Sequence, residues 1–208
     1  AARLRSLCPH APPPLVVRNG VTLPPPDPEP PPQPALPASY LLHVGHVEPR
    51  KNLGVVVDAL AALPTAQRPQ LWLAGEDAGA LTELQARAQA KSVTLHAFGV
   101  VTDDAVTSLY RHARAVVVPS VHEGFGLPAL EALAHGKPLL VSAAGALPEV
   151  VGTCARVLPP HNVAAWTAAI AAATTSPVDA TACRTHAARF SWRDAAAQLL
   201  GIWRALSG

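Results

Sequence analysis

The sequence predicts an α/β fold, a doubly wound, Rossmann-like parallel sheet with helices on both faces. The first observation is that short apolar runs alternate with helical patterns from Tyr40 onward, which is typical of repeated βα units. The second is that these runs are apolar almost throughout, as expected for strands buried on both faces of a sheet. The third is that turns containing glycine follow several of the runs.

The alternation also assigns an order to the elements. The six apolar runs are predicted strands at 40–44, 71–74, 93–98, 115–118, 138–141 and 155–158. Five stretches with helical spacing separate or follow them, at 53–63, 79–90, 103–112, 127–135 and 162–173. Ligands of such sheets bind beyond the carboxyl ends of the strands. The turns after the first, third and fourth strands are therefore expected to gather there, with the glycines Gly45, Gly99, Gly124 and Gly126.

The most informative stretch is P-S-V-H-E-G-F-G-L-P-A-L-E-A-L-A-H-G-K-P at 119–138. Glu123 lies in a glycine-bracketed turn after an apolar run, and Glu131 lies about two helical turns further on. A strand, a glycine turn and a helix in succession let a ligand approach bare backbone amides and the positive helix end. The spacing suits two groups of hydroxyls on one extended polar ligand. The alternative is that Glu131 points to solvent while the helix buries its leucines.

A second polar segment, G-H-V-E-P-R-K-N at 45–52, follows the first predicted strand. Asn52 is a predicted N-cap of the next helix. Arg50 and Lys51 would then lie near a helix N-terminus, where phosphate binds favourably. The alternative is an ordinary solvated basic pair before a helix.

Composition excludes several classes of protein. A net charge of +2 and an aromatic content of 4% do not suggest a nucleic-acid partner. There is no Walker loop and no G-x-G-x-x-G after the first predicted strand, which removes the usual signatures of nucleotide hydrolysis and hydride transfer. Cys8, Cys154 and Cys183 match no metal spacing and are predicted to be unpaired thiols in a reducing cytoplasm. No metal or cofactor is expected, and no apolar run approaches the roughly 18 residues of a membrane span.

The first 38 residues differ from the rest. Thirteen of the 23 prolines lie between Pro9 and Pro37, and the dense run at 24–34 predicts extended, polyproline-like chain. Segment 1–38 is therefore a predicted linker. Within it, residues 15–17 are predicted to form a short strand that ends in an Asn19-Gly20 turn.

Taken together, the polar blocks resemble a known family. The sequence is similar to the retaining group 1 (family 4) glycosyltransferases at V-G-H-V-E-P-R-K-N-L, L-W-L-A-G-E-D, F-G-V-V-T-D-D-A-V-T-S-L-Y, the stretch 119–138, and G-A-L-P-E-V-V-G. These blocks occur in the family's order. F-S-W-R-D-A-A-A-Q-L-L-G-I-W at 190–203 also resembles the family's closing helix.

The resemblance implies a GT-B architecture, in which two Rossmann-like domains face each other across a cleft. Residues 39–190 would be the second, donor-binding domain, and 1–38 would end the connection between the domains. Residues 191–208 would form a helix that leans on an N-terminal, acceptor-binding domain absent from this chain. The chain, which contains no methionine, is thus expected to be part of a longer protein.

The resemblance also implies roles for individual residues. Glu123 would be the catalytic residue that contacts the transferred sugar, and Glu131 would contact the ribose of a nucleoside-diphosphate sugar. Lys51, with Arg50 beside it, would face the diphosphate. The remaining donor-binding positions lie along the sugar, diphosphate and nucleoside or near the base: Phe125, Gly126, Leu127, Gly99 and Val101. Many relatives have Arg where this chain has His46, so Lys51 is expected to act on the diphosphate largely unaided.

The implied reaction is transfer of a hexose to a glycan or glycolipid of a bacterial polysaccharide pathway. The segment E-P-R-K-N at 48–52 is similar to the corresponding segment of mannosyltransferases and related transferases that use GDP-sugars. This chain alone is expected to be inactive. Any peripheral membrane contact would come from the N-terminal, acceptor-binding domain. The exposed closing helix would permit two copies of this chain to form a dimer. The alternatives are an epimerase or phosphorylase of the same fold, or a non-catalytic module for sugar-nucleotide binding or docking.

Overall fold

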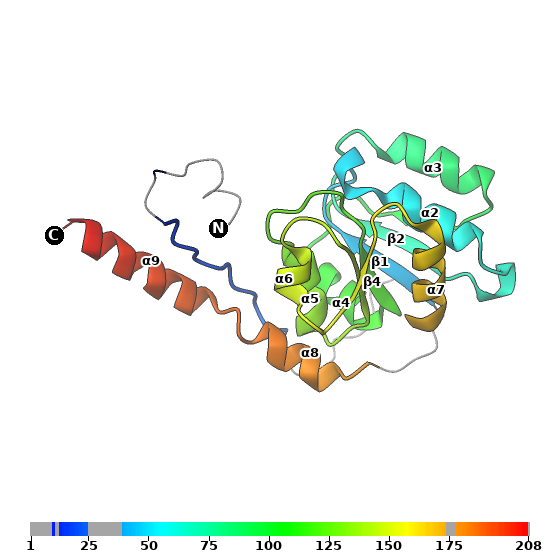
Figure 1. The fold of residues 1–208 in the computed structure, drawn as a ribbon. Coiled ribbons are helices and arrows are strands. Elements are labelled where there is room, and N and C mark those ends of the chain that lie inside the picture. Colours follow the sequence, from blue (N-terminus) through cyan, green and yellow to red (C-terminus); the bar gives the residue numbers. More distant parts are fainter. Residues whose placement is uncertain (1–9, 11–12, 25–38, 174–177, 208) are drawn as a thin grey trace.

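The computed structural model describes residues 10, 13–24, 39–173 and 178–207 (Figure 1). Cys8 and the proline run from residue 25 onward lie outside these ranges. The core is a six-stranded, all-parallel sheet with strand order β3-β2-β1-β4-β5-β6, which confirms the predicted doubly wound fold. The strands are β1 (Tyr40–Val44), β2 (Gln70–Ala74), β3 (Leu95–Ala97), β4 (Ala115–Val118), β5 (Leu139–Ser142) and β6 (Arg156–Leu158).

The helices follow the predicted alternation, and all five predicted helices are present with ends within two residues of the expectation. They are α2 (Leu53–Ala61), α3 (Leu81–Ala90), α4 (Asp103–His112), α5 (Leu127–Ala134) and α7 (Val163–Ala173). The structure adds the short helices η1 (Pro49–Lys51), η2 (Thr65–Gln67), α6 (Leu147–Val151) and α8 (Ala180–Ala187). The closing helix is α9 (Trp192–Ser207).

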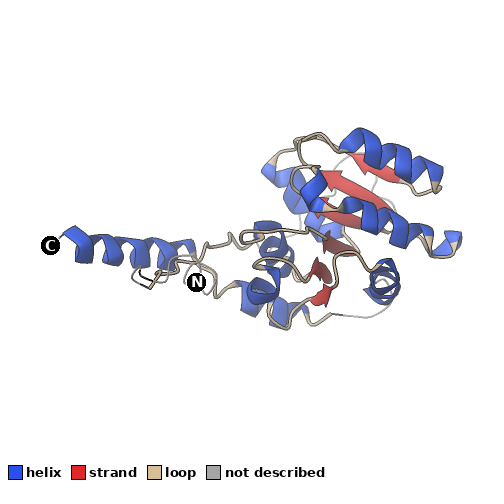
Figure 2. Cartoon of the chain, turned by 45° about the horizontal axis from the view of Figure 1, so that its top comes forward, coloured by secondary structure: helices blue, strands red, loops and turns tan. Residues whose placement is uncertain are grey.

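Helices cover both faces of the sheet, and this divides the core in two (Figure 2). Alternate residues of a strand point to opposite faces, so Leu41 and Leu42 of β1 enter different clusters. Leu41 packs with residues of α2, α3 and α7, whereas Leu42 packs with residues of α4, α5, α6 and α8. Because both faces are dry, the strands can be continuously apolar, as the sequence indicates.

The chain reverses its winding direction between β1 and β4. β1 pairs with β2 along its whole length, but with β4 only at Leu41–Ala115 and Leu42–Val116. The carboxyl halves of β1 and β4 therefore diverge beyond Val116. In open α/β sheets this switch point is where ligands bind, which directs attention to the loops after β1 and β4.

The predicted strand at residues 15–17 is wrong, since no strand is assigned within the described segment 13–24. This segment runs beside α9 rather than beside a sheet edge (Figure 1), so it has no strand with which to form a ladder. It is attached by a backbone bond from Val21 N to Phe190 O, 2.9 Å long, by the burial of Val21 in the core and by an exposed ion pair between Arg18 and Glu149 at 3.1 Å.

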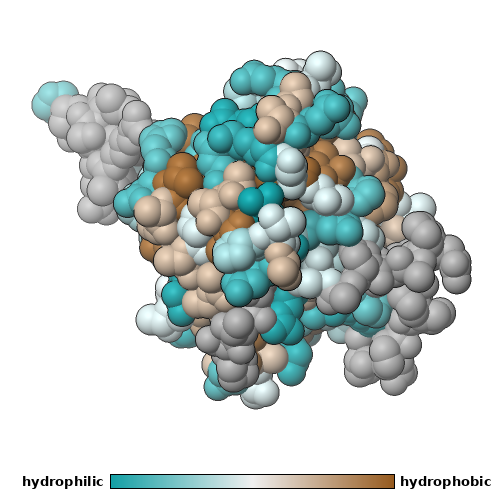
Figure 3. Space-filling view, turned by 90° about the vertical axis from the view of Figure 1, so that its right-hand side faces the viewer, coloured by the Kyte–Doolittle hydropathy of each residue, from teal (hydrophilic) through white to brown (hydrophobic). Residues whose placement is uncertain are grey.

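Helix α9 projects away from the sheet (Figure 1) and carries several exposed apolar side chains. They are Trp192, Leu199, Leu200, Trp203 and Leu206. By contrast, Figure 3 faces the opposite side of the molecule and shows apolar side chains only as small, separated brown areas. None of the helices in the described part of the chain is both long and apolar enough to span a membrane.

Candidate functional site

The loops after β1 and β4 are bonded to each other, because their strands are neighbours. Val121 N donates to Arg50 O at 2.9 Å, and the Arg50 guanidinium donates to His122 O at 2.6 Å. These bonds hold the segment before α2 against the segment before α5. Residues 72 positions apart in sequence are thereby brought into contact.

Asn52 also links neighbouring loops, and the prediction that its side chain caps α2 is wrong. It occupies the N-cap position of α2 with left-handed backbone angles (φ 53°, ψ 34°), but its side chain makes no capping bond. Its amide nitrogen instead donates to Pro119 O at 3.2 Å and to Pro160 O at 2.7 Å. The side chain bonds to neighbouring loops instead of the helix end, because two carbonyl groups of those loops accept from its N–H groups.

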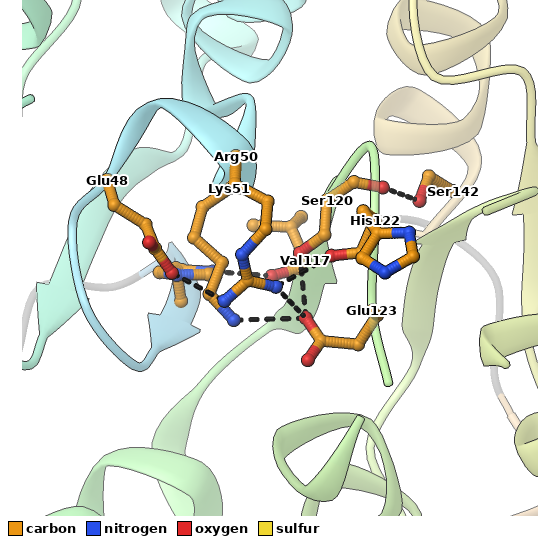
Figure 4. Close-up of polar contacts among 9 residues, drawn as sticks. Glu48, Arg50, Lys51, Val117, Ser120, His122, Glu123 and Ser142 are labelled. Atoms are coloured by element: carbon orange, nitrogen blue, oxygen red, sulfur yellow. Dashed lines mark hydrogen bonds and ion pairs between the residues drawn. The ribbon is translucent and has the colours of Figure 1, made fainter. Parts of the chain in front are cut away.

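Glu123 is the centre of a cluster of donors (Figure 4). Its Oε2 accepts from Lys51 Nζ at 3.0 Å, from Ser120 Oγ at 3.1 Å and from Arg50 Nη1 at 3.4 Å. Arg50 also donates to Glu48 Oε1 at 2.5 Å. The structure thus brings together three residues that the sequence analysis predicted for the site: Arg50, Lys51 and Glu123.

The electrostatics of this cluster favour an ionised carboxylate. Burial by itself would raise the pKa of Glu123, but the bond and charge of Lys51, the Ser120 hydroxyl and the charge of Arg50 together hold that pKa below its usual value. The Lys51 side chain is only 8% exposed and that of Glu123 is 13% exposed. A fixed negative charge and fixed positive charges therefore coexist at the carboxyl edge of the sheet.

Glu131 lies on α5 and lines a different part of the edge. Its Oε2 accepts a 2.9 Å bond from the hydroxyl of Tyr110 on α4. Burial raises the pKa of Glu131, the Tyr110 bond opposes this, and the charge of Asp103 adds to it. Glu131 is partly buried and borders a pocket of about 420 Å³ together with Leu127 and His135. It therefore faces a pocket, and its contact with a ribose stays a prediction.

The glycine turn between the two carboxylates is sterically constrained. Gly126 is the N-cap of α5 with φ +91°, and a β-carbon there would lie 2.6 Å from Leu147 Cδ2. Glycine adopts this conformation without strain, whereas a larger residue would be strained and would require the Leu147 side chain to shift. Phe125 packs against Phe190 with 6.0 Å between ring centroids and lines a second pocket of about 580 Å³. Leu127 begins α5 and borders the Glu131 pocket.

The two positions predicted to lie near a base are further along the same edge. Gly99 follows β3, and its carbonyl accepts from Gly75 N at 2.8 Å. Val101 is partly buried against the cluster that contains α4 and α5. Neither residue is among those that line the Glu131 pocket. The structure therefore places them at the expected edge without joining them to the two carboxylates.

Three polar residues of the site were not predicted. Ser120 lies within the quoted motif, three residues before Glu123, so its proximity could have been inferred from the turn. Tyr110 and Glu131 are 21 residues apart on different helices, and no local pattern pairs them. His43 has no predicted role in the sequence analysis, whereas the structure buries it completely, close to the charge of Lys51.

Comparison with known proteins identifies the fold and the family. The family model for glycosyl transferases group 1 matches residues 38–176. The O-antigen chain mannosyltransferase B of Escherichia coli is 34% identical over 177 residues, which cover 80% of this chain and 46% of that protein. Sucrose-phosphate synthase from Thermosynechococcus elongatus is 28% identical with a TM-score of 0.70, covering 82% of this chain and 46% of that one.

A further solved structure shares the fold at lower identity. HepE from Anabaena, determined in complex with UDP and glucose, is 22% identical with a TM-score of 0.66, covering 80% of this chain and 48% of that one. The chain spans about half the length of these relatives. The family match includes the loops after β1 and β4 and both carboxylates. The chain therefore belongs to the group 1 glycosyltransferase family, as its sequence motifs indicate.

Proposed function

We propose that this chain is the donor-binding domain of a retaining glycosyltransferase that transfers a hexose, with GDP-mannose as the donor, to a glycan or glycolipid. The observation that carries the proposal is the cluster of Lys51, Arg50 and Glu123 at the switch point of the sheet, beside the N-terminus of α5. A second domain outside this chain would bind the acceptor. Alone, this domain binds the donor without transferring sugar.

The positive groups suit a diphosphate leaving group. When the glycosidic bond breaks, negative charge develops on the nucleoside diphosphate and needs cations or helix amides already in place. Lys51 supplies an ammonium on a nearly buried side chain, and Arg50 supplies a guanidinium in contact with the same carboxylate. The first turn of α5 adds backbone N–H groups and the positive end of the helix dipole.

The carboxylate of Glu123 suits sugar hydroxyls. All three of its donors bond to Oε2, and Oε1 takes no hydrogen bond from the residues that the structure describes (Figure 4). Charge-assisted bonds from hydroxyls to an ionised carboxylate are stronger than neutral ones. Glu123 can therefore accept from the transferred sugar at Oε1 while its other oxygen stays anchored.

The nucleotide and the sugar are proposed from the names of similar proteins. The Escherichia coli relative is named a mannosyltransferase, which supports mannose and, with it, a guanosine donor. HepE was determined with UDP and glucose, which makes uridine the principal alternative to test. In this chain Glu131 would hold the ribose, because it faces a pocket next to Leu127 at the start of α5.

A titration of the chain tests the proposal. We would measure calorimetric binding and melting temperature with GDP, UDP, ADP and TDP, and with the corresponding sugar nucleotides. Ligand at about 100 times its dissociation constant should add about 2.7 kcal/mol to the free energy of unfolding. Lys51→Ala should weaken binding enough to remove most of this stabilisation at the same ligand concentration, whereas Lys91→Ala, which removes a lysine paired to Asp58 on a distant surface, should retain it.

The outcomes separate the candidates. Binding of one base, lost in Lys51→Ala, supports a donor site and names the nucleotide. Absence of binding to every nucleotide would contradict the proposal for this chain and favour a docking module. Product analysis of the longer protein then distinguishes transfer with retention from epimerisation. Robust sugar transfer by this chain alone would contradict its expected inactivity.

A further inference from the structure

A buried histidine, His43, lies on β1 close to the charges of Lys51 and Glu123, and it is 0% exposed. Its Nδ1 lies 3.1 Å from Val117 O. Val117 is the residue just beyond the last β1–β4 pair, Leu42–Val116, so the ring bridges the strands where they diverge. Because a carbonyl only accepts, Nδ1 must carry the hydrogen, and Nε2 of the neutral ring is left as an acceptor.

This acceptor completes no hydrogen bond in the described part of the chain, although the backbone of His46 lies near the ring. It faces the space above Gly45, where a β-carbon would lie 3.9 Å from His43 Nε2 and also 3.9 Å from Lys51 Nζ. Glycine leaves that space open between the imidazole and the ammonium. A buried, unpaired acceptor is costly, and an apolar side chain at this strand position would avoid the cost. The histidine therefore requires an explanation beyond core packing.

The charged groups around the ring keep it neutral. Burial lowers the pKa of His43 to about 4, and the positive charge of Lys51 acts in the same direction. The Val117 bond, the charge of Glu123 and the backbone of His46 oppose this shift without overcoming it. At neutral pH the ring thus presents a lone pair, and no positive charge, beneath the Lys51 ammonium.

We propose that His43 is a positioning residue for Lys51, whose ammonium donates to His43 Nε2, directly or through one water, when a nucleoside-diphosphate sugar occupies the site. The inference rests on the proposed function. In the free domain Lys51 Nζ bonds to Glu123 Oε2 at 3.0 Å. A bound diphosphate competes with that carboxylate for the ammonium, and a neutral acceptor below the ammonium can then hold it without cancelling the charge that the diphosphate needs.

Two substitutions separate this role from a purely structural one. His43→Asn keeps an N–H near the position of Nδ1 for Val117 O and removes the Nε2 acceptor. His43→Gln places an amide oxygen near the position of Nε2 and gives up the Val117 bond. We expect His43→Asn to melt near the wild-type temperature but to bind the nucleotide identified by titration about tenfold more weakly, the effect of losing one hydrogen bond to a charged group. We expect His43→Gln to melt lower and to bind nearly as well as the wild type.

The same set of proteins shows whether the effect passes through Lys51. In a Lys51→Ala background, His43→Asn should cause no further loss of affinity, since the group that it positions is gone. Equal losses in both backgrounds, or normal affinity of His43→Asn, would overturn the inference. A wild-type chain that binds none of the nucleotides would instead be a failure of the proposed function.

A measurement on the unsubstituted chain guards against variants that do not fold. Two-bond ¹H–¹⁵N spectra of the histidine rings report which nitrogen carries the hydrogen and whether the other accepts a bond. We expect Nδ1 of His43 to be protonated, and Nε2 to shift toward the hydrogen-bonded range when nucleotide is added. A ring protonated at Nε2, or an Nε2 resonance unmoved at saturating nucleotide, would contradict the inference.

Discussion

Lys51 Nζ lies 3.0 Å from Glu123 Oε2, and these two side chains are 8% and 13% exposed. They come from the loops after β1 and β4, which are adjacent strands in the sheet although 72 residues separate the pair. Removing two charges from water is costly, and removing only one partner of such a pair is costlier still. The pair is therefore a sensitive point for both stability and ligand binding.

Replacing Glu123 by Gln should separate sugar binding from nucleotide binding. The variant keeps an amide oxygen for Lys51 but loses the charge, so we expect the free energy of unfolding to fall by about 2 kcal/mol. Affinity for the nucleotide sugar should fall about tenfold, whereas affinity for the nucleoside diphosphate alone should be retained. Calorimetry and urea denaturation measure both effects. Glu83→Gln, on the exposed side of α3, is the control. If Glu123→Gln loses the same affinity for the nucleoside diphosphate as for the nucleotide sugar, a role of Glu123 toward the sugar is contradicted.

Stability should fall in mild acid because of His135, a partly buried histidine at the C-cap of α5. Burial, followed by the charges of Arg111 and Lys137, lowers the pKa of His135 to about 4. Below about pH 6.5 the unfolded chain takes up a proton that the folded chain resists, so stability is lost as the pH falls from about 6.5 toward 4. His43 acts in the same direction. His135→Phe can keep the 4.9 Å stacking on Tyr110 and should make this loss shallower in urea titrations. Parallel curves for variant and wild type between pH 7 and 4 would refute the assignment.

Two glycines in the turn after β4 should respond differently to alanine. At Gly126 the positive φ and the 2.6 Å approach to Leu147 predict a loss of about 1–3 kcal/mol for Gly126→Ala. A β-carbon on Gly124 would meet nothing within 4 Å, so Gly124→Ala should leave stability nearly unchanged. Thermal denaturation of both variants makes the comparison. Equal melting temperatures would show that the turn can relax.

The apolar side of α9 should make the chain self-associate. Leu199 and Trp203 are 57% and 68% exposed, which is unusual for large apolar side chains on one helix. The double variant Leu199→Ser and Trp203→Ser should reduce association in sedimentation experiments and leave the melting temperature within about 1–2 °C. Arg193→Ser on the same helix is the control. A wild-type chain that stays monomeric at all concentrations would contradict the expectation.

Much of the fold could be predicted because each element is marked locally. Continuous apolar runs mark strands buried on both faces, and β1 and β4 were predicted to the residue. Helix α4 was also predicted with both ends correct, since Thr102 caps it with a bond from Ala105 N and Asp103 begins its first turn. The strand expected at residues 15–17 carries such marks and still failed, because no neighbouring strand lies there to pair with it. The short helix α6 was not predicted, because its five residues are too few to show a helical pattern.

By itself, the sequence determined that this chain would form a doubly wound sheet with glycine turns at its carboxyl edge, and which motif residues would be found in those turns. Only the tertiary structure decided that Lys51 would pair with Glu123, that Tyr110 would hold Glu131, and that Asn52 would bond to neighbouring loops instead of capping its helix. The physical reason is the separation along the sequence of the residues that make each contact. Burial patterns and turn residues report on the local chain, whereas these contacts depend on which strands and helices become neighbours, and that is settled by packing the whole core.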